Sequence, residues 1–178
     1  MRVSVMPWYA LPAKTFIWIS LLAFDVIWLL LVLFQNQYVL PVLAMTAVLL
    51  LLYPDKKSAL LYCCVIALPG IGLDTILSIS GVFSFQDAVM PLWLMLLWIN
   101  FALTLPYGFA FIKGLAVPIQ ALLGALASFS YLIGRQMGAV EFPFSVVLTQ
   151  SLLILLWAAL LPVFFLLIRQ TQRVNLHE

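Results

Sequence analysis

The stretch FIWISLLAFDVIWLLLVLF, residues 16–34, decides how this chain folds. It holds 19 residues with a single charge, Asp25, and stops at Gln35-Asn36-Gln37. A helix needs about 20 mostly apolar residues to cross the hydrocarbon core of a bilayer. The run is longer than the roughly 7–15 apolar residues of a cleavable signal peptide, and it lacks a small-x-small cleavage site. We therefore expect an uncleaved membrane-spanning helix here.

Further apolar stretches of the same kind follow along the chain. We place the predicted spans at residues 16–34, 39–53, 58–79, 90–112, 117–134 and 143–168. Such spans use up most of the sequence and leave only short loops and tails. The predicted fold class is therefore all-α, with a single integral membrane domain over residues 1–178 that forms a bundle of six transmembrane helices.

The composition of the whole chain also indicates a membrane protein. Hydrophobic residues make up 66% of the 178 residues and charged residues only 8%, against roughly 45–50% and about 25% in soluble proteins. Too few polar side chains remain to cover a water-soluble particle. The net charge of +2 is too sparse for a surface that follows nucleic-acid phosphates. Soluble enzymes, disordered tails and nucleic-acid binders are therefore excluded.

The basic residues predict the orientation of the bundle in the membrane. Seven of the eight Lys and Arg residues fall on one side of the predicted spans, and only Arg135 falls on the other. The seven are Arg2, Lys14, Lys56, Lys57, Lys113, Arg169 and Arg173. Because cytoplasmic flanks collect Lys and Arg, we expect both termini to be cytoplasmic.

The sequence offers no ligand set for a metal or a haem. Cys63 and Cys64 are adjacent, no Cys-x-x-Cys spacing occurs, and the single histidine, His177, is the penultimate residue. Neighbouring cysteines form a strained bridge at best, so we interpret both as small packing side chains. We expect neither a metal site nor a cofactor.

A few polar residues inside the apolar stretches form the candidate site. Asp25 lies at the middle of the first span, where an aspartate costs about 2.5–3.5 kcal/mol to insert. Asp74 follows Pro69-Gly70-Ile71-Gly72, a stretch that can kink a membrane helix. Intramembrane acids usually face the bundle interior, beside a partner or water. The complete predicted cluster, in the middle and non-cytoplasmic half of the bilayer, is Asp25, Asp74, Asn100, Thr104, Tyr131 and Arg135.

Several contacts are expected around this cluster. Arg135 is the predicted counter-ion of Asp74, with Glu141 as the competing partner of the arginine. Asp25 is either a protonated acid hydrogen-bonded to a neighbouring helix or a functional group. The cluster fits a packing salt bridge as well as a functional site. Small residues at Gly124 and Ser128 favour close helix contact in the fifth span. Interfacial or near-interfacial positions are expected for Trp8, Trp18, Trp93 and Trp157.

Motifs in the second half of the chain carry a family resemblance. In order they are GLDTIL (72–77), GVFSF (81–85), PLWL (91–94), LW (97–98), FALTL (101–105), LGA (123–125), SY (130–131) and GRQMGA (134–139). With these motifs the chain resembles a family of small bacterial inner-membrane proteins, domain of unknown function 2878. It departs from the family pattern after Thr104, where Pro106-Tyr107-Gly108-Phe109 replaces an Asn-His-Ser-Leu-like segment. The absent histidine weakens the case for shared acid–base chemistry.

The resemblance implies a location in the bacterial inner membrane but no assigned activity. Genes of this family often occur beside fatty-acid-modifying enzymes of the cyclopropane-synthase type, which implies work on lipids. We favour an accessory or scaffold protein in membrane lipid modification, whose partners are membrane lipid and either another membrane protein or a second copy of the chain. The alternatives are an intramembrane enzyme acting on an apolar, lipid-like substrate, with Asp25 or Asp74 as acid or base, and a small proton-coupled transporter that uses both.

Overall fold

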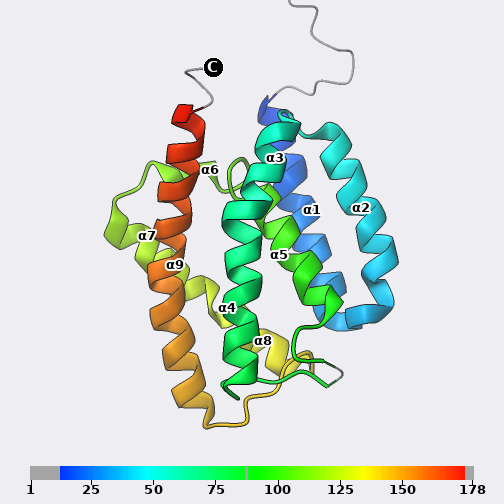
Figure 1. Ribbon diagram of the computed structural model, residues 1–178, viewed down its shortest axis with the longest axis vertical. Coiled ribbons are helices and arrows are strands. Elements are labelled where there is room, and N and C mark those ends of the chain that lie inside the picture. The colour runs from blue at the N-terminus through cyan, green and yellow to red at the C-terminus, as the bar shows by residue number, and fades with distance from the viewer. Residues whose placement is uncertain (1–12, 87, 175–178) are drawn as a thin grey trace, which may run out of the picture.

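The computed structural model describes residues 13–86 and 88–174, and these residues are mainly helical (Figure 1). The helices are α1 (Ala13–Phe34), α2 (Val39–Leu52), α3 (Lys56–Tyr62), α4 (Leu68–Ile79), α5 (Leu92–Thr104), α6 (Ala110–Lys113), α7 (Val117–Ala127), α8 (Phe129–Gln136) and α9 (Val146–Val174). No β-strand forms in this part of the chain. The predicted all-α class is confirmed, whereas Arg2, Trp8 and His177 lie outside the described residues.

Four helical segments are long and apolar enough to cross a membrane, so the chain has the helices of a membrane protein. They cover residues 14–52, 56–79, 117–136 and 146–172. The first segment contains both α1 and α2, which are connected by a 3-10 turn at Gln35–Tyr38. The chain reverses direction at this turn, so the two helices run in opposite directions (Figure 1). Gln35 takes a φ of 50° in this turn, a left-handed value that is uncommon outside glycine. The helix α5 is apolar but has only 13 residues.

The predicted span at 90–112 is not one continuous helix, and this expectation is corrected by the structure. α5 ends at Thr104 and α6 begins at Ala110. Pro106 has no N–H for the helical ladder and its ring obstructs the preceding turn. Gly108 lies so close to α5 that a Cβ added to it would be 2.8 Å from Thr104 Cγ2. The predicted span at 117–134 falls within the apolar helical segment 117–136, in which a turn at Ser128 separates α7 from α8.

A π-helical segment at Cys63–Ala67 joins α3 to α4. There the Leu68 N–H bonds to the carbonyl oxygen of Cys63, five residues earlier. Pro69 follows directly, and a proline inside a helix lacks one N–H and clashes with the carbonyl of the preceding turn. The wider π turn makes room for the proline ring. The irregularity expected at Pro69-Gly70 is therefore a widened turn just before the proline.

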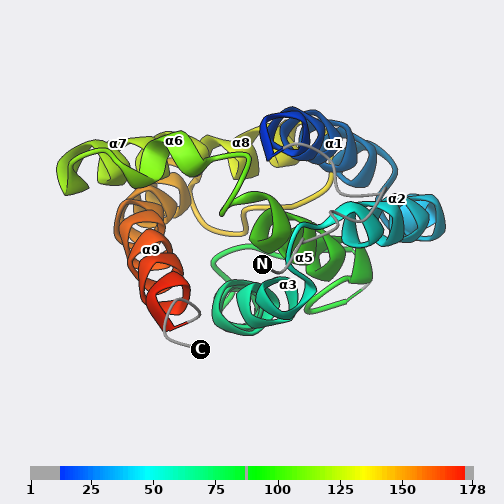
Figure 2. The same cartoon turned by 90° about the horizontal axis from the view of Figure 1, so that it is seen from above.

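The helix α5 lies at the centre of the bundle (Figure 2). α1, α2 and α4 pack against α5, while α7 packs along α9 on the opposite side of the molecule. The contact of α7 with α9 is close because α7 has no side chain at Gly124, where an added Cβ would lie 2.1 Å from the carbonyl oxygen of Trp157. The small residue thus lets the two backbones touch, as the sequence suggested.

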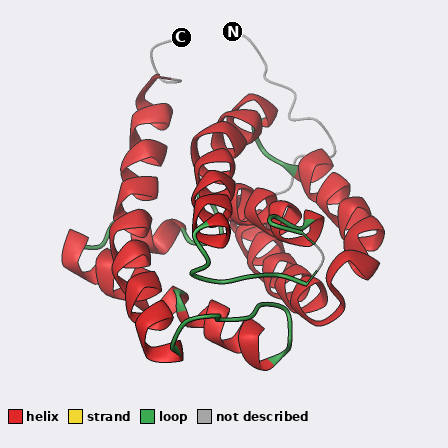
Figure 3. Cartoon of the chain, turned by 60° about the horizontal axis from the view of Figure 1, so that its bottom comes forward, coloured by secondary structure: helices red, strands yellow, loops and turns green. Residues whose placement is uncertain are grey.

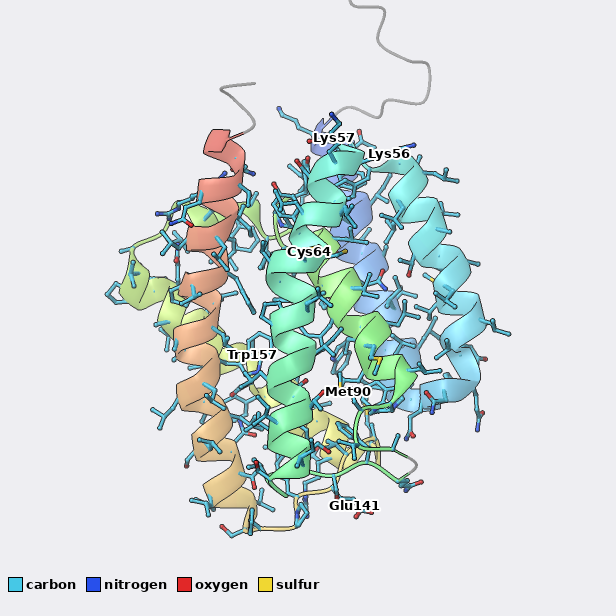
Figure 4. All side chains as sticks on the ribbon, in the orientation of Figure 1. Lys56, Lys57, Cys64, Met90, Glu141 and Trp157 are labelled. Atoms are coloured by element: carbon cyan, nitrogen blue, oxygen red, sulfur yellow. The ribbon has the colours of Figure 1, made fainter. Side chains whose placement is uncertain are left out.

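The two ends of the bundle differ in their charged residues and in the length of their loops. Lys56 and Lys57 lie at one end and Glu141 at the other (Figure 4). Near the lysine end, Arg169 Nη2 donates to the carbonyl oxygen of Lys113, and Lys113 Nζ donates to Gln172 Oε1 over 2.7 Å. At the opposite end two long loops lie together (Figure 3), and they are joined by an isolated bridge between Ser84 and Glu141.

Asp55 caps the first turn of α3 and gives a testable pH dependence. Its side chain accepts hydrogen bonds from Ser58 Oγ and from the backbone N–H of Lys57. These hydrogen bonds hold the pKa of Asp55 below its usual value, and the bond from Ser58 has the largest effect. Replacing Asp55 with alanine should lower the free energy of unfolding by about 1 kcal/mol near neutral pH.

The effect should disappear in acid. Because the folded-state pKa is lowered, the contribution of the ionised cap is complete above the unfolded-state pKa, near pH 4, and is lost as the pH falls through the folded-state value. Thermal denaturation in mild detergent across this pH range measures the difference between wild type and Asp55→Ala. A difference of constant size down to the lowest pH contradicts the assigned role of the ionised cap.

Candidate functional site

A partly open pocket of about 470 Å³ lies beside α5. Its walls come from α1 and α5 on one side and from α6, α7, α8 and α9 on the other. They are mainly apolar, and aromatic rings contribute a large share. The aromatic lining residues are Phe24, Trp28, Phe85, Trp93, Trp98, Phe101, Phe109, Phe111, Tyr131 and Trp157.

The mouth of the pocket lies between α1 and the α6–α7 side. The exposed lining residues are Asp25 on α1, Phe111 on α6 and Ala127 on α7. α1 packs on α5 and α2, while α7 packs on α9 (Figure 2). Residues from both of these groups line the pocket. Its lining includes residues of α6 and of the loop after α8, which lie toward opposite ends of the bundle (Figure 1). The pocket is therefore elongated and opens at the side of the bundle.

Three side chains from three helices meet at the inner wall of this pocket. Asp74 of α4 is buried, with 1% of its surface exposed. Trp98 Nε1 of α5 donates to Asp74 Oδ2 over 2.8 Å, and the Tyr131 hydroxyl of α8 lies 2.9 Å from both carboxyl oxygens. Trp98 and Tyr131 line the pocket, whereas Asp74 lies behind them. The arrangement links α4, α5 and α8 through one acid.

The position of Trp98 is fixed from two sides. Its indole stacks on that of Trp157, with ring centroids 5.6 Å apart and planes inclined by 12°. On another side it lies against Gly70, where an added Cβ would be 2.3 Å from the ring. Trp157 is itself buried, with 8% of its surface exposed. Trp157, like Trp93 among the predicted interfacial tryptophans, therefore forms part of the pocket wall.

The predicted ion pair between Asp74 and Arg135 is not formed. Arg135 is exposed, and its guanidinium lies over the ring of Phe142, 5.8 Å from the ring centroid. Neutral donors from Trp98 and Tyr131 satisfy the buried acid instead. They avoid the desolvation of a guanidinium, which a buried ion pair requires. Glu141 lines the same small surface pocket as Arg135, but among the described residues no ion pair joins the two.

The remaining members of the predicted cluster lie apart from Asp74. Asn100 is fully buried and its Nδ2 donates to Thr46 Oγ1 of α2 over 2.9 Å. Thr104 is also buried, and its Oγ1 has no hydrogen-bond partner within the described part of the chain. Asp25 is exposed at the pocket mouth and makes no hydrogen bond to a described residue. The structure thus brings together only Asp74 and Tyr131, and places Asp25 on the rim of the pocket that Tyr131 also lines.

Comparison with known proteins places the chain in a family. The family described as "Protein of unknown function (DUF2878)" matches residues 17–163. The chain belongs to the DUF2878 family. Every residue that lines the pocket of this DUF2878 protein falls within the matched range. No curated protein and no solved structure matches the chain.

Proposed function

We propose that this DUF2878 protein is an accessory protein of membrane lipid modification in the bacterial inner membrane, and that it binds a long-chain, lipid-like molecule in its lateral pocket. The supporting observation is the elongated aromatic pocket of about 470 Å³. Ligand pockets commonly measure about 300–1,000 Å³ and are lined mainly by apolar side chains. Because the mouth lies at the side of the bundle, between apolar helices, a molecule dissolved in the bilayer can enter without crossing water.

The membrane arrangement that suits this function has six crossings and cytoplasmic termini. α2 and α5 are two of the crossings in this arrangement, and both are short, with 14 and 13 residues. α2 counts as a crossing because it runs in the opposite direction to α1, and α5 because it lies at the bundle centre (Figures 1 and 2). Lys56 and Lys57 lie at the proposed cytoplasmic end, opposite Glu141 (Figure 4). This distribution of charge follows the positive-inside rule. Membrane lipid is the first partner, and another membrane protein or a second copy of the chain is the proposed second partner.

Retention of a bound molecule tests the proposal. Native mass spectrometry of the protein in mild detergent should detect one apolar molecule per chain. Ala127→Phe places a ring at the pocket mouth and should reduce occupancy about tenfold, which corresponds to about 1.4 kcal/mol of binding free energy. Leu122→Phe is the matched control, because Leu122 lies on the same helix, is 60% exposed and does not line the pocket.

Two results contradict this prediction. One is a wild-type protein that carries no apolar molecule, although it remains folded. The other is equal occupancy in Ala127→Phe and Leu122→Phe. Extraction and identification of the retained molecule then give its chemical class.

A second candidate function is an intramembrane enzyme acting on an apolar, lipid-like substrate. The observation that favours it is Tyr131, which lines the pocket and whose hydroxyl bonds to the buried acid Asp74. Such a pair can hold or pass a proton next to a bound molecule. In a deletion strain with an altered lipid profile, Tyr131→Phe should restore the profile if the protein only binds lipid. It should fail to restore it, although folded and loaded with ligand, if the pair performs chemistry.

A further inference from the structure

We propose that the molecule held in the pocket carries a hydrogen-bond donor, a hydroxyl or an amine, part-way along its hydrocarbon chain, and that Asp25 binds this donor. The inference rests on the proposed function, since it names the ligand class of the same pocket. The supporting observations are the polar side chains that line the pocket and their position along the pocket.

The lining offers one free acid and no basic side chain. Apart from the tryptophans, its polar side chains are Asp25, Ser130 and Tyr131. Tyr131 and Trp98 already bond to Asp74, whereas Asp25 makes no hydrogen bond to a described residue. No Lys or Arg lines the pocket, so a phosphate or a carboxylate headgroup finds no counter-charge there. A donor group, by contrast, finds the carboxyl oxygens of Asp25.

The acid lies part-way along the pocket rather than at one end of it. Asp25 is near the middle of α1, and the neighbouring Phe24 ring contacts Phe101 and Phe109, with centroids 5.9 and 6.0 Å apart. The lining also includes Phe111 of α6 and Val140 of the loop after α8, and these two elements lie toward opposite ends of the bundle (Figure 1). A hydrocarbon chain can therefore extend on both sides of the carboxyl group. A molecule with its polar group at one terminus leaves part of the pocket empty or leaves Asp25 unpaired.

The depth of Asp25 leads to the same ligand class. An acid near the middle of a membrane helix is unfavourable unless it has a partner. The headgroups of ordinary phospholipids stay at the membrane surface, outside the hydrocarbon core. A donor within the chain of the ligand reaches the acid while its apolar arms remain in the aromatic pocket. Binding then supplies the partner that α1 lacks.

Three matched compounds test the inference on the full-length protein in lipid nanodiscs. They share one long chain and differ at its middle carbon: a secondary alcohol, the corresponding ketone and the plain alkane. A brominated alkane serves as the reporter, because heavy atoms quench the fluorescence of the tryptophans that line the pocket, such as Trp98 and Trp157. Each compound is titrated until it displaces the reporter and restores the fluorescence.

The alcohol should displace the reporter at about tenfold lower concentration than the ketone or the alkane, since only the alcohol donates a hydrogen bond to a carboxyl group. Asp25→Leu should abolish this preference while leaving displacement by the alkane unchanged. Asp25→Asn keeps the size of the side chain and should reduce the preference. Val26→Leu is the control, because Val26 is exposed beside Asp25 and does not line the pocket.

The outcomes separate this inference from the proposed function. Equal displacement by alcohol and ketone in the wild type overturns the role of Asp25, while displacement by the alkane still supports a pocket that binds hydrocarbon chains. A preference that survives in Asp25→Leu or stays at full strength in Asp25→Asn overturns it as well. Failure of all three compounds to displace the reporter overturns both the inference and the proposed function.

Discussion

Replacing Gly124 with alanine should force α7 away from α9 and lower the free energy of unfolding by about 1–3 kcal/mol, as overpacking of a tight contact does. The added Cβ would lie 2.1 Å from the carbonyl oxygen and 2.9 Å from the carbonyl carbon of Trp157. Both atoms belong to the backbone, so no side-chain rotation relieves the overlap. Gly124→Val should be more damaging, because it adds two further methyl groups at the same contact.

The loss of stability is measured by heating the purified protein in mild detergent and determining the folded fraction by gel filtration. Gly72→Ala is the matched control, since Gly72 is also helical and an added Cβ there meets nothing within 4 Å. The control should be neutral or more stable, because alanine favours a helix over glycine by up to about 1 kcal/mol. Equal melting of Gly124→Ala and Gly72→Ala contradicts the close α7–α9 contact.

Replacing Asp74 with alanine should be the most damaging change at the pocket wall. It removes the acceptor of the Trp98 N–H and of the Tyr131 hydroxyl. A buried donor left without a partner costs about 1–3 kcal/mol, so two such donors predict a loss of about 2–6 kcal/mol. The indole of Trp98 also loses its anchor, and we expect its fluorescence to change with the loss of stability.

Asp25→Ala is the control for this experiment. Asp25 is exposed and makes no hydrogen bond to a described residue, so its removal breaks no contact within the described part of the protein and should not lower the free energy of unfolding. In a double-mutant cycle, Asp74→Ala and Tyr131→Phe should lose less together than the sum of their single losses, because they break one shared contact. Additive losses, or equal losses for the two aspartate variants, contradict the central role assigned to Asp74.

Most of the helices could be predicted from the sequence, because apolar length is a local property. Residues 16–34 alone predict α1, which the structure places at Ala13–Phe34. The sequence predicts the interrupted span at 90–112 as one helix, because apolar residues continue on both sides of Pro106 and Gly108. Those two residues were the available signal: a proline without an N–H and a glycine pressed against the preceding helix.

The candidate site was harder to predict, because spacing along a helix gives the depth of a residue but not its neighbouring helix. Asp74 and Tyr131 were expected in one cluster, and the structure joins them. Arg135 was expected beside Asp74 because opposite charges attract, but two neutral donors satisfy the acid without burying a guanidinium. Trp98 was not expected in the site, and only the general need of a buried acid for donors pointed toward such a partner.

The short length of α5 has a consequence for how the protein is assembled. A helix of 13 residues rises about 20 Å, whereas the hydrocarbon core is about 30 Å thick. In the proposed six-crossing arrangement, the loop before α5 and the irregular turns after it therefore enter the depth of the membrane. Irregular backbone is tolerated there only where protein shields it. Such a segment cannot settle in lipid alone. For that arrangement we expect the centre of the bundle to be completed late during synthesis, after α1 to α4 have formed the surroundings into which α5 fits.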